Sequence, residues 1–203
     1  MTMKISVVWL KRDLRLSDHQ PLAEAIAAGF PILILYCFEP SLLAAPQSSD
    51  RHWRFVCESL KDIEQRLVPL QGNLLICRAE VKTVFTQIQQ EYSIQAVYSH
   101  QETGIAVTYA RDQDMLAYFN AQGIPWKEYQ QQGVQRKRKN RKGWESFWLA
   151  FMTAPLAHPA LDRATFLSIP EPQQLKNVFS TFPEAWTTSQ DLMQPGGERN
   201  GRR

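Results

Sequence analysis

The stretch Pro31-Ile-Leu-Ile-Leu-Tyr-Cys-Phe38 decides the fold class of this 203-residue chain. It is an almost unbroken apolar run, which is typical of a strand buried on both faces of a parallel sheet. Lys4 to Leu10 repeats the pattern with β-branched residues, and weaker runs of the same kind occur at 74–77, 96–99 and 126–129. The sequence therefore predicts five strands.

Helical windows separate these strands. They cover residues 21–28, 49–67, 81–92 and 105–121. Three of the helix exits carry a glycine, namely Gly29, Gly72 and Gly123. Glycine favours the left-handed residue that ends a helix. Strand, helix and glycine in this repeating order predict an α/β fold, a five-stranded parallel doubly wound (Rossmann-like) sheet with helices on both faces.

The pattern changes after residue 132. Trp144, Phe147, Trp148 and Phe151 form an aromatic stripe on a short helix. From Ala154 onward six prolines occur in 50 residues, a composition typical of an extended connector. We therefore expect an α/β domain over residues 1–132 and a helical, proline-rich linker over residues 133–203.

Composition narrows the class of protein. Apolar residues make up 44% and charged residues 21% of the chain, which is ordinary for a soluble protein. No apolar run approaches the roughly 20 residues of a membrane span, and because the Met-Thr-Met-Lys start has no apolar h-region, no secretory leader is expected. Cys37, Cys57 and Cys77 form no C-x-x-C pair, so neither a disulfide framework nor a metal site is predicted. A cytoplasmic location is expected.

One segment concentrates positive charge. Residues 136–142 carry six Lys or Arg in seven positions. Such a run can follow nucleic-acid phosphates, or it can be a solvated linker. The segment has no interleaved aromatic residues for base stacking, and its charges precede a helix, so the linker interpretation is favoured.

In an open parallel sheet, ligands bind beyond the carboxyl ends of the strands. The polar segments expected there are residues 11–19, 39–40, 50–51 and 100–104. No glycine-rich dinucleotide or nucleotide-triphosphate fingerprint follows the first strand. No serine, cysteine or histidine forms a recognisable nucleophile–base pair, so no catalytic residue is predicted.

Residues 8–19, Val-Trp-Leu-Lys-Arg-Asp-Leu-Arg-Leu-Ser-Asp-His, resemble the opening motif of the DNA photolyase and cryptochrome family. Other segments resemble the family in the same order along the chain, at 49–60, 100–104, 109–112, 133–155 and 195–198. Because the matches are colinear and reach over essentially the whole chain, the resemblance is specific.

The resemblance implies a light-harvesting role. In this family the N-terminal α/β domain holds an antenna chromophore, which is a folate, a deazaflavin or a flavin. The chromophore passes energy to FAD in a C-terminal helical domain, which also holds the pocket for the flipped pyrimidine dimer. That helical, FAD-binding domain is expected to be absent from these 203 residues, which stop shortly after Gly196-Gly197-Glu198.

Three functions stay open on sequence grounds. The first is the antenna domain of a photolyase or cryptochrome, with light-driven repair of pyrimidine dimers as the parent reaction, DNA contact only through the parent protein, and no repair by this chain alone. The second is a stand-alone nucleotide-type binding domain. The third is an interaction module that docks on a helical partner through the stripe at residues 144–151.

The candidate chromophore-binding residues are Arg12, Phe38, Glu39, Arg51 and Glu102. We expect the loops after the first, second and fourth strands to meet in one cleft. There the carboxylates can accept hydrogen bonds from ring N–H groups, and the arginines can donate to ring carbonyls. A structural alternative for Glu102 is a cap, or a partner for Arg51 or Arg111.

The loop after the first strand carries three further expectations. Arg12 and Asp13 are expected to brace this loop through a mutual or interdomain ion pair. Asp18 is expected to cap the following helix. His19 is expected to lie on the surface at the start of that helix.

Overall fold

The computed structural model describes residues 2–167, 178, 181–188 and 194–201. Residues 168–177 and 189–193 of the expected proline-rich linker lie outside the described residues. None of the helices in the described ranges combines the length and the apolar character that crossing a lipid bilayer requires.

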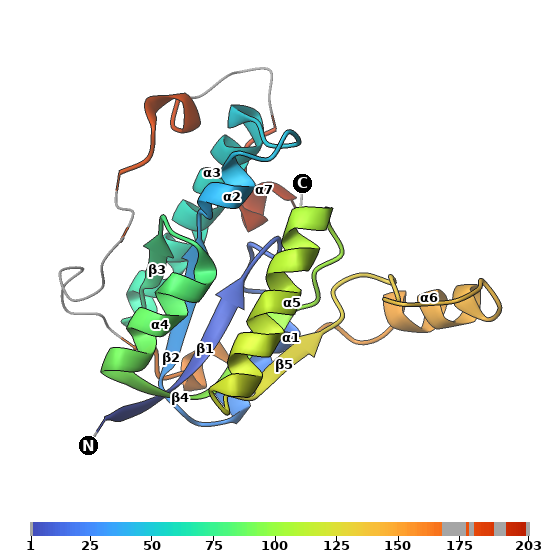
Figure 1. The fold of residues 1–203 in the computed structure, drawn as a ribbon, viewed down its shortest axis with the longest axis horizontal. Helices are drawn as coiled ribbons and strands as arrows, with labels where there is room; N and C mark the ends of the chain where they lie inside the picture. The colour runs from blue at the N-terminus through green and yellow to red at the C-terminus, as the bar shows by residue number, and fades with distance from the viewer. Residues whose placement is uncertain (1, 168–177, 179–180, 189–193, 202–203) are drawn as a thin grey trace.

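Five parallel strands form one sheet, as the sequence predicts (Figure 1). The strands are β1 (Met3–Leu10), β2 (Ile32–Cys37), β3 (Leu74–Cys77), β4 (Tyr92–His100) and β5 (Trp126–Tyr129). Their order is β3-β2-β1-β4-β5, and every neighbouring pair is parallel. The chain therefore changes direction across the sheet between β1 and β4, which is where ligands bind in folds of this kind.

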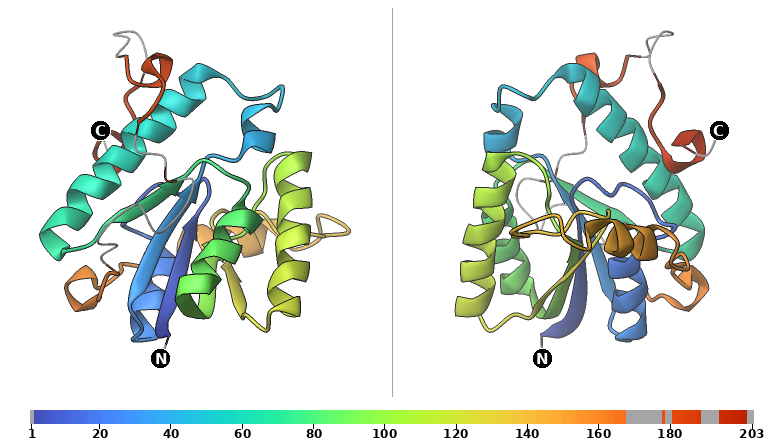
Figure 2. Two further views of the ribbon diagram at one scale, coloured as in Figure 1. Left: turned by 60° about the vertical axis from the view of Figure 1, so that its left-hand side comes forward. Right: turned by 90° about the vertical axis from the view of Figure 1, so that its right-hand side faces the viewer.

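Helices cover both faces of the sheet (Figure 2). Helices α1 (Gln20–Ala27) and α3 (Asp50–Leu67) pack on one face, and α4 (Val81–Glu91) and α5 (Ala106–Ala121) pack on the other. A short helix that the sequence analysis did not anticipate, α2 (Pro40–Leu43), follows β2. The described sheet and helices therefore form the expected three-layer α/β arrangement.

Strand β2 is buried on both faces, which explains its continuous run of apolar residues. All six of its residues are buried. Ile34 and Tyr36 face the core under α1 and α3, whereas Leu33 and Leu35 face the core under α4 and α5. Successive side chains of a strand point to opposite faces, so a strand covered on both faces can expose no polar position.

The predicted glycine exits are confirmed at two of three positions. Gly29 and Gly123 have positive φ angles of 74° and 65°. At the third exit the left-handed residue is Gln71, with φ of 55°. Gly72 serves a different purpose, because a Cβ atom there would lie 2.9 Å from the ring of Phe166.

Residues 130–157 leave the sheet as a projecting arm that carries α6 (Trp144–Met152) (Figure 1). No residue of α6 is fully buried, and the rings of Trp144 and Trp148 stack on each other at 6.1 Å. The arm returns to the domain at Ala157. The Ala157 N–H donates to Asp18 Oδ1, and the His19 N–H donates to the Ala157 carbonyl.

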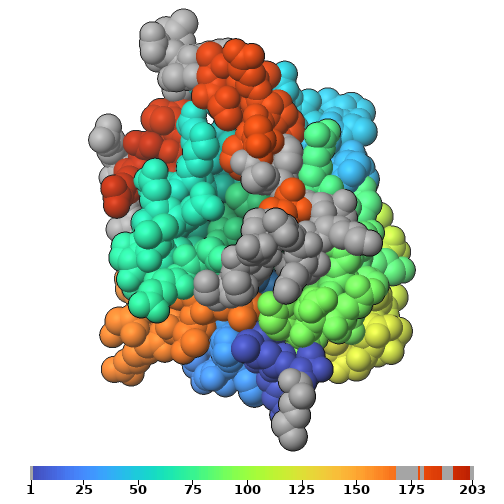
Figure 3. Space-filling view, turned by 90° about the vertical axis from the view of Figure 1, so that its left-hand side faces the viewer, coloured from blue at the N-terminus to red at the C-terminus, as the bar shows by residue number. Residues whose placement is uncertain are grey.

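The described parts of the remaining chain lie against the domain. Phe166 continues the sheet beside Ile32. The segment 181–188, orange-red in Figure 3, packs on α3, and the Trp186 ring contacts the rings of both Phe38 and Trp53. Helix α7 (Glu198–Gly201) also docks near α3, where the Gly197 N–H donates to Ser59 Oγ.

We predict that Gly72→Ala destabilises the fold by about 1–3 kcal/mol, because the added methyl group overpacks the site against the Phe166 ring. The measurement is the free energy of unfolding in urea. Gly201→Ala is the matched control, since nothing lies within 4 Å of the position that its methyl group would take. Equal stability of the two variants would contradict the assigned role of Gly72.

Candidate functional site

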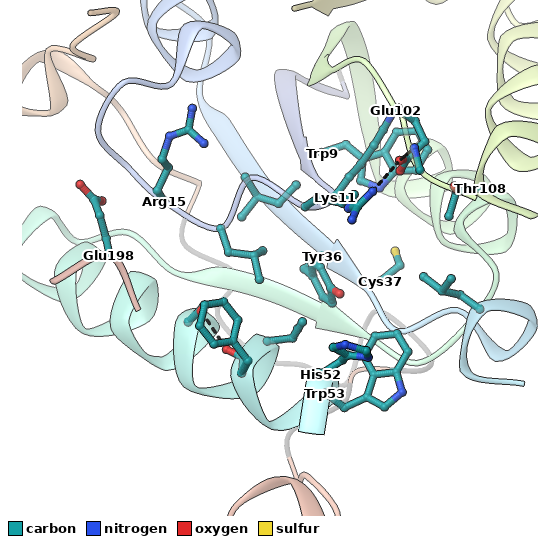
Figure 4. A pocket seen from close by; sticks show the side chains of 18 of the residues that line it. Trp9, Lys11, Arg15, Tyr36, Cys37, His52, Trp53, Glu102, Thr108 and Glu198 are labelled. Atoms are coloured by element: carbon teal, nitrogen blue, oxygen red, sulfur yellow. Dashed lines mark hydrogen bonds and ion pairs between the residues drawn. The ribbon is translucent and has the colours of Figure 1, made fainter. Parts of the chain in front are cut away.

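A pocket of about 950 Å³ opens at the carboxyl ends of β1 and β2 (Figure 4). Its wall includes the rings of Trp9, Tyr36 and Trp53, which come from β1, β2 and α3. Glu102 lies toward one end and Glu198 toward the other (Figure 4). The volume is in the range of clefts that enclose one drug-sized ligand.

Three of the five predicted site residues line this pocket. They are Arg12, Glu39 and Glu102. Phe38 continues the alternation of β2, so its side chain points into the core, where it stacks on Trp186 at 5.5 Å. Arg51 is exposed in the first turn of α3, about half a turn from the buried Trp53. These two residues therefore lie outside the pocket.

Arg111 organises the acidic wall of the pocket. Its guanidinium donates to Glu39 Oε1 at 2.8 Å and to Glu102 Oε2 at 3.2 Å, and it also pairs with Asp112. Burial alone would lower the pKa of Arg111, but the carboxylates, Glu39 first, raise it. Burial also raises the pKa of Glu39 despite this pairing.

Both oxygens of the Glu102 carboxylate accept hydrogen bonds from the protein. Its Oε1 accepts from the Gly104 N–H at 2.7 Å, and its Oε2 accepts from Arg111. The structural alternative, a partner for Arg111, therefore describes the contacts of Glu102. A ligand that used Glu102 as an acceptor would share its oxygens with these bonds, since a carboxylate oxygen can accept more than one.

A second set of charges is buried beside Trp9. Lys11 Nζ lies 2.8 Å from Asp112 and 4.5 Å from the centre of the Trp9 ring. Burial lowers the pKa of Lys11. Arg136 joins this set, because its guanidinium donates to the Glu102 carbonyl and to Glu128.

The position of Arg136 corrects the interpretation of residues 136–142 as a uniformly solvated run. Arg136 is a half-buried anchor that holds the start of the arm against the pocket wall. The exposed charges of the segment are Lys137, Lys139, Arg141 and Lys142.

Arg12 is the pocket-lining cation with the most available donors. Its side chain is 65% exposed and approaches Glu102 Oε1 only to 3.8 Å. No hydrogen bond to the described part of the chain uses any of its side-chain N–H groups. The expected pairing with Asp13 is wrong, because Asp13 is committed to other partners.

Asp13 forms a buried cluster with two histidines. Its Oδ2 lies 2.6 Å from His100 Nδ1 and 2.8 Å from His19 Nε2, and its Oδ1 accepts from the Lys11 N–H. Burial opposes ionisation of Asp13, but His100 and His19 together hold its pKa well below the ordinary value. Burial lowers the pKa of His100.

The start of α1 also differs from the expectation. His19 is fully buried and is itself the N-cap, since its Nδ1 accepts from the Leu22 N–H. Asp18 adopts a left-handed φ of 48° and holds the returning arm instead. The His19 side chain points inward because the buried carboxylate of Asp13 needs a partner.

The ligand atoms of Asp13, His19 and His100 lie within 4.8 Å of one another, close enough to surround a metal ion. A histidine that binds a metal normally donates a hydrogen bond from its other ring nitrogen. Here His19 Nδ1 accepts a hydrogen bond, so the neutral ring carries its proton on Nε2, toward Asp13. The cluster therefore fits a proton network and does not fit a divalent cation.

The opposite end of the pocket is built by Arg15 and Glu198 (Figure 4). Arg15 donates to the carbonyls of Ser17 and Asp18. Glu198 accepts from the Leu16 and Ser17 N–H groups and pairs with Arg66. Burial raises the pKa of Glu198, but the bonds from Ser17 and Arg66 outweigh it and hold the pKa at about 2.

The sequence analysis missed several residues of the pocket. The sequence places Tyr36 in a predicted strand, Trp53 in a predicted helix and Arg111 beside Glu102 as a possible partner, but it predicts none of them as a pocket residue. The signal for Tyr36 was its place near the carboxyl end of β2. Arg111 is five residues inside α5, and only the packing of α5 on the sheet brings it to β2.

Comparisons with known proteins identify relatives of this chain by sequence. The family model described as DNA photolyase matches residues 6–142. The cryptochrome DASH of Gloeobacter violaceus is 34% identical over 107 residues, which are 50% of this chain and 21% of that protein. The chain thus spans about a fifth of that curated relative.

Solved structures show the same fold. An archaeal photolyase from Sulfolobus tokodaii superposes with a TM-score of 0.70 at 17% identity, over 98% of this chain and 45% of that one. A cryptochrome from Synechocystis superposes with a TM-score of 0.63 at 18% identity, over 88% of this chain and 42% of that one.

We predict that Asp13→Asn lowers the free energy of unfolding at pH 7 by about 3 kcal/mol, because it removes the charged partner of two buried histidines. The folded-state pKa of Asp13 lies below its ordinary value of 3.8. Its contribution is therefore present above about pH 4 and is lost as the pH falls further.

The measurement is urea unfolding of both proteins from pH 7 downward past pH 4, and the difference between them should shrink only below about pH 4. Asp114→Asn, at an exposed position of α5, is the control and should match the unsubstituted protein. A constant difference at every pH would show that the charge of Asp13 is not what stabilises the fold.

Proposed function

Because the chain belongs to the DNA photolyase family, we propose that its α/β domain binds an antenna chromophore that collects light for a flavin enzyme. The observation that carries this proposal is the ring-lined pocket of about 950 Å³ at the carboxyl ends of β1 and β2. The pocket lies beside the switch in strand order between β1 and β4, where open sheets bind ligands.

The available groups of the pocket suit a flat heterocycle with carbonyl oxygens. Tyr36 and Trp53 offer ring surfaces, and Arg12 offers unused N–H donors at the rim. A folate, a deazaflavin or a flavin has this combination of a flat ring and carbonyl acceptors. The archaeal photolyase structure is described as holding two FAD molecules, with the implication of a novel light-harvesting cofactor, and this supports the proposal by analogy.

The parent activity is proposed to be light-driven repair of pyrimidine dimers in DNA. FAD would be held by a helical domain, and DNA would be bound through the parent protein. The 203 residues align with less than half of the solved relatives, so the chain by itself is proposed to be inactive in repair. Buried thiols at Cys37, Cys57 and Cys77 suit a reducing, cytoplasmic location.

A second candidate function is docking on a helical partner. It is favoured by α6, which exposes Trp148, Leu149 and Met152. The two functions are compatible, because α6 lies on the arm and the pocket lies in the domain. The alternative of a nucleotide-type binding domain has less support, since no glycine-rich phosphate loop follows β1.

We predict that Val56→Trp lowers chromophore affinity at least tenfold. Val56 is a half-buried residue of α3 that lines the pocket, so the larger side chain fills space that the ring would occupy. The measurement is visible absorbance retained by the protein after reconstitution and gel filtration. Val68→Trp, 66% exposed just after α3, is the control and should retain the chromophore. Equal retention by both variants would place the chromophore elsewhere.

We also predict that residues 1–203 do not repair dimer-containing DNA under blue light, with or without added FAD. The reason is that the described residues form a five-stranded α/β domain and its arm, whereas FAD is proposed to be held by a helical domain. Dimer loss is measured against a control without protein, and a full-length relative serves as the positive control. Repair above the protein-free control would contradict the assignment of an antenna role alone.

A further inference from the structure

A second, smaller cavity lies beside the aromatic pocket. Its volume is about 260 Å³. Its lining is almost wholly polar and comprises Lys11, Arg12, His100, Gln101, Glu102, Thr103, Gln131 and Gln132. It therefore lies at the carboxyl ends of β1 and β4 and beside the first residues of the arm.

The two cavities share three lining residues, Lys11, Arg12 and Glu102. Lys11 is committed to Asp112, and both oxygens of Glu102 are committed to Gly104 and Arg111. Arg12 is thus the residue at this junction that keeps its hydrogen-bonding capacity available to a ligand.

The loop after β4 leaves room for the Arg12 guanidinium. A Cβ atom on Gly104 would lie 2.8 Å from Arg12 Nη1 and 2.6 Å from Glu102 Oε1. Glycine at this position leaves the space into which the guanidinium fits. The guanidinium therefore has room between the two cavities beside the loop after β4, and 65% of the Arg12 side chain is exposed.

The rest of the small cavity also presents unused donors. The side chains of Gln101, Thr103, Gln131 and Gln132 make no hydrogen bond to the described residues. Amide and hydroxyl groups donate readily to phosphate and carboxylate oxygens. A guanidinium adds charge and a forked geometry that suits the same oxygens.

From these contacts we infer that the small cavity is the subsite for an anionic tail of the ligand. On this view, which rests on the proposed function, the ring occupies the aromatic pocket, and a phosphate or carboxylate on its side chain crosses Arg12 into the small cavity. Arg12 is then a specificity-determining residue, which selects ring ligands that carry an anionic substituent.

The test compares FMN with riboflavin, which share one ring system and differ in the phosphate. Binding of each to residues 1–203 is measured by quenching of flavin fluorescence. We expect FMN to bind at least tenfold more tightly, and we expect added salt to weaken FMN alone. Arg12→Gln should weaken FMN binding by a larger factor than riboflavin binding, so that most of the difference between the two affinities disappears.

Arg51→Gln is the matched control, since Arg51 is exposed and lines neither cavity. A parallel titration with methenyltetrahydrofolate distinguishes a carboxylate tail from a phosphate tail. The tail subsite would be overturned if FMN and riboflavin bound with equal affinity and Arg12→Gln did not change the affinity for the folate. The chromophore proposal would stand in that case. Failure of all three probes to bind would overturn both.

Discussion

The architecture around the pocket depends on the burial of one carboxylate, that of Asp13. Asp13 binds the backbone at the end of β1 through the Lys11 N–H, the start of α1 through His19, and the end of β4 through His100. These three elements flank the switch in strand order. A buried carboxylate must be paired, so the loop after β1 has to adopt a conformation that brings Asp13 to these three partners. That conformation places Arg12 and Arg15 at the pocket.

The layered fold could be predicted from the sequence because a buried strand requires a recognisable run of apolar residues. A strand covered on both faces must be apolar at every position, and residues 31–38 satisfy that demand. The positions of Arg12, Glu39 and Glu102 followed from the same logic, since the ends of parallel strands share one edge of the sheet. Directions of individual side chains did not follow. Phe38 continues the alternation of side chains along β2, so its ring points into the core. Arg51 lies on the solvent-exposed side of α3.

The contacts that escaped prediction are those between elements far apart in the chain or joined by an unusual turn. His19 looked like a surface residue because it reaches its partner, Asp13, only through the turn at Asp18. Gly72 looked like a helix terminator because Phe166 is 94 positions away. Glu102 looked available for a ligand because Arg111 reaches it from inside α5. Local pattern carries no information about which distant group packs against a given residue.

The arm is fixed at both of its roots. Arg136 holds the outgoing segment of the arm to Glu128, and Ala157 holds the returning one to Asp18. Between these anchors the closure entropy rises by only about 0.6 kcal/mol for each doubling of length. The interval between 136 and 157 is therefore a place where the chain can be lengthened, shortened or exchanged at small energetic cost. The exposed side chains of α6 can therefore change, by natural variation or by mutagenesis, without changes to the α/β domain that carries the arm.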